Sequence, residues 1–239
     1  MTLEGARRPA LDTVAVVLGV LAALAVTAAL VVLVWTATRQ SGPPRQLVTA
    51  DGRTGVVLEV PGEDRGWQVL DRDTRIAYAL GADRPGVFVV APAVFGADVC
   101  EATGQATSRA FVGLTGRLAA GLSDGAAAGR AALGATHRRV ARDWLTALTR
   151  SPGGGGQPAG TGLESGRRAA VDGTPARSST AVVSLVAGSC NPPRVELTVI
   201  SLRVGPSVSS AVMVRDLGVG AAGLSDVDAR AILASLQRG

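Results

Sequence analysis

The sequence contains a short motif that resembles the nucleophile elbow of serine hydrolases. Gly121–Gly125 reads GLSDG and matches the pattern G-x-S-x-G. An elbow needs a strand directly before the serine and a histidine far downstream. The preceding residues are not strand-like, and the one histidine of the chain, His137, lies 14 residues beyond Ser123 in the same predicted helix. We therefore interpret Ser123 or Asp124 as a helix N-cap.

A second motif matches the glycine-rich fingerprint of dinucleotide-binding proteins. Gly218–Gly223 reads GVGAAG, which fits G-x-G-x-x-G letter for letter. That mechanism requires a following strand, with an acidic residue about 20 positions on to bind the ribose. The residues after Gly223 are predicted to form a helix instead, with Ser225 as its N-cap and Asp228 three positions later. We interpret the motif as a flexible loop and expect no nucleotide cofactor.

Residue types argue against several other kinds of chemistry. The chain has no lysine, so it can form neither a Walker A phosphate loop nor a Schiff base. Cys100 and Cys190 are 90 positions apart, which is not the spacing of a zinc site, and we expect no metal. The net charge of +5 rests on arginine alone. Three Trp, three Phe and one Tyr offer few stacking surfaces, so we expect no nucleic acid partner.

The carboxylates and the histidine favour structural roles. Glu63 with Asp64, and Asp71 with Asp73, lie in predicted turns. Because glycosidase carboxylates follow no spacing rule, a carboxylate-dependent cell-envelope hydrolase stays open as an alternative. His137 lies at the margin of an apolar helix stripe, which predicts a partly buried, hydrogen-bonded histidine. We assign no catalytic residue.

Three arginines form a candidate binding surface. Arg138, Arg139 and Arg142 lie mostly away from the apolar stripe of a helix predicted over 124–150. Such a face is commonly just solvated, but basic surfaces also attract anionic headgroups and envelope polyanions. We therefore treat these three residues as a candidate polyanion-contact face.

The two cysteines are expected to form one disulfide. Cys100 and Cys190 each follow a strand-like run, and neighbouring strands can bring such ends to bridging distance. Thiols tend to oxidise outside the cytoplasm, and an even count without metal-like spacing fits a single bridge. Two unrelated buried thiols are the alternative, since free cysteine often packs as a small hydrophobe.

An apolar run near the start predicts a membrane anchor. Val14–Trp35 has 22 residues, of which Thr27 is the one polar side chain. As a helix it would be about 33 Å long, enough to cross a hydrocarbon core of about 30 Å. A secretory signal has a shorter apolar region, although a long signal cut near Ala37 is an alternative. We expect a single-pass membrane protein with a cytoplasmic tail (1–13), a transmembrane helix (14–35), a spacer (36–50) and an extracytoplasmic domain (51–239).

Hydrophobic periodicity predicts an α+β domain. Alternating runs bounded by turn residues predict strands over 55–61, 67–70, 76–80, 87–91, 178–187, 194–202 and 209–214. Helical spacing predicts helices over 124–150 and 225–236. The apolar stripe of the longer helix consists of Leu133, Val140, Ala141, Trp144 and Leu148. A glycine-rich loop over 151–162 ends that helix. This order of elements predicts a largely antiparallel sheet covered by helices.

Several short stretches, taken in order, resemble a known group of proteins. They are GVVLEVP followed by GW, a cysteine after the first strands, ARDWLTAL on the long helix, a second cysteine between late strands, and ILASLQR. The set resembles the extracytoplasmic domain of actinobacterial single-pass membrane proteins, which is similar to the PsbP-like α/β/α sandwich of LpqN-type lipoproteins. The resemblance implies an N-terminal transmembrane helix followed by such a sandwich. It implies no catalytic residues.

Together these observations predict a membrane-tethered extracytoplasmic domain that acts as a non-enzymatic binding or accessory module at the cell surface. The hydrolase is one alternative, and a deep pocket with converging carboxylates would favour it. A subunit of a larger membrane complex is the other, and a contiguous exposed apolar patch would favour that.

Overall fold

The computed structural model describes residues 45–49, 54–80, 85–101, 104, 106–115, 118–119, 126–150, 163–165, 170–171, 173–185 and 192–239. The predicted tail over 1–13, the apolar run Val14–Trp35, and the glycine-rich loop over 151–162 lie outside these residues. So do Cys190 and the GLSDG motif.

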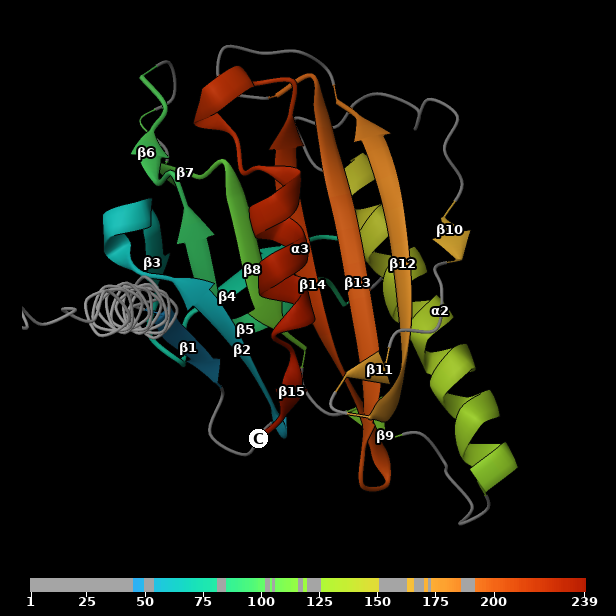
Figure 1. Cartoon of the computed structure of the whole chain (residues 1–239). Coiled ribbons are helices and arrows are strands. Elements are labelled where there is room, and N and C mark those ends of the chain that lie inside the picture. Colours follow the sequence, from blue (N-terminus) through green and yellow to red (C-terminus); the bar gives the residue numbers. More distant parts are fainter. Residues whose placement is uncertain are drawn as a thin grey trace, which may run out of the picture. The chain divides into compact units, whose positions relative to one another are not determined.

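One large antiparallel sheet organises the domain (Figure 1). Its strands, in spatial order, are β10 (Glu164–Ser165), β12 (Thr174–Ser184), β13 (Arg194–Val204), β14 (Ser207–Leu217), β8 (Ala110–Leu114), β5 (Val87–Phe95) and β3 (Trp67–Val69). Three short strands pair beside this path: β11 (Ala170–Val171) with β12, β4 (Arg75–Tyr78) with β5, and β9 (Leu118–Ala119) with β14. The long hairpin of β13 and β14 turns through Gly205 and Pro206, and Gly205 supplies the positive φ of 58° that such a two-residue turn needs.

A second, smaller sheet joins segments from the two ends of the domain. β1 (Arg45–Thr49) pairs with β2 (Val56–Pro61), and β2 pairs with β15 (Gln237–Arg238). A two-stranded pair of β6 (Asp98–Val99) and β7 (Ala106–Thr107) lies apart from both sheets. The helical elements are α2 (Ala126–Arg150), α3 (Asp226–Ala234) and two short 3₁₀ turns, η1 (Glu63–Arg65) and η2 (Gly220–Ala222).

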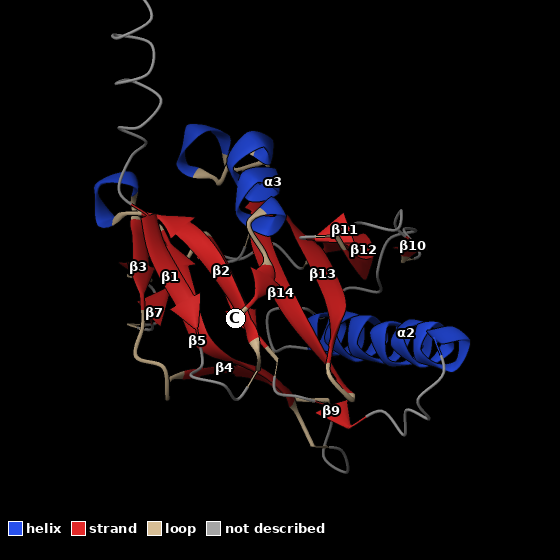
Figure 2. Cartoon of the chain, turned by 60° about the horizontal axis from the view of Figure 1, so that its bottom comes forward, coloured by secondary structure: helices blue, strands red, loops and turns tan. Residues whose placement is uncertain are grey.

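Both faces of the large sheet are covered, which explains why β14 is buried along nearly its whole length. On one face, α2 packs its apolar stripe against Leu197, Val199 and Val212. On the other face, α3 and the second sheet pack against Ile200, Leu202 and Met213. Figure 2 shows α2 and α3 on opposite sides of β13 and β14. The alternation of side chains along each strand therefore supplies two separate apolar clusters.

The fold class predicted from the sequence, a transmembrane helix followed by a PsbP-like α/β/α sandwich, is wrong. Within the described residues no helix is long and apolar enough to cross a membrane. The helix α2 carries arginines along its outer face, and α3 has nine residues. The described domain is mostly antiparallel sheet with these two α-helices, and a second sheet shares one face with α3. Pairing between β1, β2 and β15 creates that layer, and such distant pairing leaves no mark in local periodicity.

Candidate functional site

The outer face of α2 presents Arg138, Arg139 and Arg142 to solvent. Their position follows from the helical period, because Val140, Ala141 and Trp144 face the sheet and the three arginines fall on the exposed side of the helix. All three side chains are exposed, as the sequence predicts. Within the described part of the chain, no ion pair includes any of them.

A fourth arginine extends this surface from the sheet. Arg177 on β12 is half-buried and lies directly opposite Ser201 of β13. Ser201 bonds to His137 of α2, so Arg177 is on the same face of the sheet as the helix. Arg177 and Arg138 both lie near enough to His137 to oppose a positive charge on its ring. We call Arg138, Arg139, Arg142 and Arg177 the α2 arginine face.

Beneath this surface, His137 points into the domain. Its Nδ1 lies 2.8 Å from the Oγ of Ser201, and its Nε2 lies 2.8 Å from the Oγ of Ser179. Ser201 continues the chain of hydroxyls to Ser210 of β14, at 2.7 Å. The imidazole is only 4% exposed. The predicted hydrogen bonding of His137 is confirmed, and the residue is fully buried where partial burial was predicted.

The surroundings of His137 favour its neutral form. Burial is the largest cause that lowers its pKa below the ordinary value, because an imidazolium is poorly solvated there. A hydrogen bond to the backbone of Ser178 acts in the opposite direction. The positive charges of Arg177 and Arg138 lower the pKa further.

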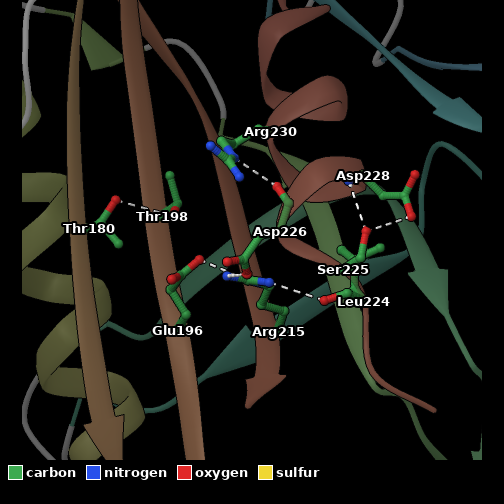
Figure 3. A network of polar contacts seen from close by, with 9 residues as sticks. All are labelled: Thr180, Glu196, Thr198, Arg215, Leu224, Ser225, Asp226, Asp228 and Arg230. Carbon is green, nitrogen blue, oxygen red and sulfur yellow. Dashed lines mark hydrogen bonds and ion pairs between the residues drawn. The ribbon is translucent and has the colours of Figure 1, made fainter. Parts of the chain in front are cut away.

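The opposite face of the sheet carries an ionic network around the buried Arg215 (Figure 3). The Nε of Arg215 donates to Glu196 at 2.8 Å, and its Nη2 lies 2.6 Å from a carboxylate oxygen of Asp226. Its Nη1 donates to the carbonyl of Leu224 at 3.0 Å. The guanidinium thus joins β13 and β14 to the first turn of α3, which begins after the N-cap Ser225, as predicted.

The carboxylate of Asp226 in this network does not have the protonation state that a glycosidase acid needs. The hydrogen bond from Arg215 is the largest cause that lowers the pKa of Asp226, so this carboxylate is ionised at neutral pH. A glycoside hydrolase needs one carboxyl group that still holds its proton. We therefore interpret the pair of Glu196 and Asp226 as the partners of a structural clamp.

Asp216 follows Arg215 on β14. Among the described carboxyl groups, it has a strongly raised pKa. Its side chain is nearly buried on the α2 side of the sheet, 3.5 Å from the guanidinium of Arg109. Burial raises its pKa to about 6, against an opposing effect of Arg109. The charge of Asp216 in turn adds to burial in raising the pKa of Tyr78.

Asp216→Asn should stabilise the domain at neutral pH and leave it unchanged near pH 4. Because the pKa is raised from 3.8 to about 6 on folding, the native state holds a proton that the unfolded chain releases within that window. Ionised Asp216 therefore costs stability above pH 6, by about 1–3 kcal/mol. Urea unfolding at pH 4, 5, 6 and 7.5 measures the difference, with the exposed Asp64→Asn as a control. A stabilisation that is equal at every pH would contradict this explanation.

The remaining sequence-predicted residues are placed as follows. Cys100 is buried after β6, and its predicted partner Cys190 lies outside the described residues, so the disulfide stays a prediction. The glycines of GVGAAG form a turn containing η2 between β14 and α3, and β15 then pairs antiparallel to β2. No parallel βαβ unit forms there. In the described portion of the chain, no group of His, Cys, Asp and Glu side chains could hold a metal ion.

Sequence reasoning missed Arg177 and the Arg215 network. Arg215 could have been found from its position, because it is a charged residue within the largely apolar strand β14. A buried guanidinium is almost always paired, so its place in the strand indicated that partners exist. Arg177 gave no such signal, since its role depends on where α2 packs.

Comparison with known proteins gives the family of the chain. The model of DUF8017, a domain of unknown function, matches residues 39–239. The chain belongs to the DUF8017 family. No curated protein matches this DUF8017 chain. A solved structure of a protein of unknown function from Pseudomonas aeruginosa is similar at 13% identity and a TM-score of 0.27, covering 74% of this chain and 85% of that one. Such a likeness is too low to carry an argument. The resemblance of the DUF8017 chain to the PsbP-like group stays a prediction.

Proposed function

We propose that this DUF8017 domain is a non-enzymatic binding module that contacts phosphate-bearing polyanions at the cell surface through the α2 arginine face. The observation that carries the proposal is the cluster of exposed arginines on one rigid helix, without ion-pair partners among the described residues. Arginine is permanently charged and its planar guanidinium matches phosphate oxygens in pairs.

The packing of α2 supports this role. Trp144, Val140 and Leu148 fix the inner face of the helix against the sheet, so the outer arginines are held at constant spacing. A preorganised set of cations loses less conformational freedom on binding than cations on a mobile loop. The acidic residue of α2 is Asp143, so the helix has a clear excess of positive charge.

The proposal places the domain at the cell membrane, on its extracytoplasmic side. The predicted disulfide between Cys100 and Cys190 favours such a compartment, because thiols remain reduced in the cytoplasm. The partner would be the anionic headgroups of the membrane surface, and soluble envelope polyanions would compete for the same arginines.

The alternatives have less support. Asp226 is tied to Arg215 and is ionised, which does not favour the hydrolase. The large apolar side chains that the described residues expose, Leu47, Phe88 and Val227, belong to three different elements. Scattered exposed hydrophobics of this kind do not mark an interface for a larger membrane complex.

Replacing Arg138, Arg139 and Arg142 together by Gln should weaken binding to anionic vesicles about 100-fold at low salt. Each arginine near an anionic surface contributes about 1 kcal/mol, and the effect is screened as ionic strength rises. The measurement is co-sedimentation with phosphatidylglycerol vesicles, with phosphatidylcholine vesicles and short inorganic polyphosphate as parallel probes. Binding to polyphosphate but not to vesicles would identify a soluble polyanion as the partner.

A matched control separates local from overall charge. Arg194, Arg230 and Arg238 are exposed away from α2, and changing them to Gln removes the same charge. Arg194 lies on the same face of β13 as Glu196, opposite α2, whereas Arg230 and Arg238 belong to α3 and β15. This control variant should bind vesicles almost as the native protein does. Equal losses in the two triple variants would show that net charge alone attracts the protein, and the proposal would fail.

A further inference from the structure

The single histidine of the chain lies directly under the proposed binding surface. His137 precedes Arg138 on α2 and points inward, while Arg138 points outward. Arg177 stands opposite Ser201, the residue whose hydroxyl bonds to the Nδ1 of His137. The imidazole thus bonds to a buried hydroxyl network, with Arg138 next to it on α2 and Arg177 beside that network on β12.

The serine hydroxyls around His137 can accommodate a second proton on its imidazole ring. Both ring nitrogens face serine oxygens, which can either donate to a neutral nitrogen or accept from an N–H. The backbone of Ser178 also bonds to the ring. Protonation would therefore need only a rotation of the hydroxyls of Ser179 and Ser201, and no rebuilding of the packing.

Among the described residues, the charged groups that act on His137 are cations. Arg138 comes from α2 and Arg177 from β12, and each opposes a positive charge on the ring. Arg203 lies two residues beyond Ser201 on the same face of β13, where its Nε donates to the carbonyl of Gly205. β14 contributes the neutral Ser210. The carboxylate of α2, Asp143, is six residues further along the helix.

We propose that anion binding at the α2 arginine face and protonation of His137 favour one another, so that the domain binds its polyanion more tightly in acid. Bound phosphate neutralises Arg138 and Arg177 and removes the repulsion that opposes the imidazolium. Linkage is reciprocal, so a proton on His137 must strengthen anion binding by the same factor. This inference rests on the proposed function and adds a pH response to it.

The pKa of His137 is consistent with this coupling. It is lowered chiefly by burial and then by the two arginines, so part of the lowering is removable by a bound anion. Because the folded pKa is lowered, stability is complete above the unfolded value and falls as pH drops below it. A bound anion should reduce this loss in acid.

The test uses His137 as its own reporter, because an NMR titration of the one histidine needs no assignment of neighbours. We expect its titration midpoint to move upward when the protein is saturated with short polyphosphate. We also expect polyphosphate affinity to rise about five-fold between pH 7.5 and pH 5.5. His137→Gln should keep the affinity at pH 7.5 and lose the additional rise.

A second variant keeps the inference testable if His137→Gln does not fold. Arg177→Gln removes one of the two opposing charges, so the midpoint of His137 in the free protein should rise. Absence of binding to both polyphosphate and phosphatidylglycerol vesicles at every pH would overturn the proposed function and this inference with it. Normal binding with an unchanged His137 midpoint in the free and bound proteins would overturn this inference alone.

Discussion

Trp144→Ala is expected to lower the free energy of unfolding by about 3–5 kcal/mol, through lost transfer energy and the cavity that remains. Trp144 is 1% exposed and fills the space between α2 and the sheet. Its ring meets Tyr78 edge-on at 5.7 Å and Phe111 at 6.1 Å, measured between centroids. The indole therefore completes a three-ring cluster that no smaller side chain can rebuild. Urea unfolding followed by circular dichroism gives the value.

The outer face of the same helix supplies the control. Arg139→Ala removes an exposed side chain without an ion pair in the described structure, and should change stability by less than about 0.5 kcal/mol. If Trp144→Ala were as mild as Arg139→Ala, the stripe that anchors α2 would not face the sheet. The rigid display of the α2 arginine face would then lose its basis.

Arg215→Met is expected to destabilise the domain by about 1–3 kcal/mol, because it leaves the carboxylate of Glu196 and the buried carbonyl of Leu224 without their shared donor. Arg215 is 6% exposed, and its three polar contacts are to Glu196, Asp226 and Leu224. Methionine fills much of the volume but offers no hydrogen-bond donor. The start of α3 should loosen first.

Amide hydrogen exchange shows which elements lose stability in Arg215→Met. Amides of α3 should exchange faster in Arg215→Met, whereas those of α2 should keep their protection. Arg230→Met is the matched control on α3 itself, because Arg230 is exposed and donates only to the backbone carbonyl of Asp226. Uniform acceleration across the domain would mean that Arg215 supports global stability without clamping α3.

The elements that sequence patterns predicted well are those with a strong local period. The apolar stripe on α2, the strands predicted over 194–202 and 209–214, and the Ser225 cap are all confirmed. The segments that the sequence patterns missed are short or depend on distant pairing partners. β8 contains Gly113, which is needed because a Cβ there would lie 2.7 Å from Val89. A glycine within a five-residue run weakens the strand signal.

The end of β5 shows a different limit. The predicted strand ended at Ala91, yet β5 continues through Pro92 to Phe95. Ala91 has a φ of 45°, and the bulge between Val90 and Ala93 lets β5 leave β4 and pair with β3. Proline is tolerated because the ladder is already interrupted there. A single sequence does not disclose such an exchange of partners.

The residues of the candidate site also fall into those that local periodicity predicted and those that only the tertiary fold brings together. Arg138, Arg139 and Arg142 follow from the helical period, so their exposure was predictable. His137 meets serines that are 42 and 64 residues away in sequence, and Arg177 joins the surface only through the register of β12 and β13. These contacts are properties of the tertiary fold.

The small sheet has a consequence for the order in which the chain can fold. β2 is paired by β15, whose residues are synthesised about 180 positions later, and Ser235 bonds to the backbone of Glu59. A hairpin of β1 and β2 alone is marginal in water. Until residues 232–238 have emerged, Leu58 and Val60 lack Ile232 and Leu236, which belong to the same apolar cluster. The nascent domain thus keeps part of this apolar surface exposed until its last strand has been made, and during that interval the surface is prone to aggregation.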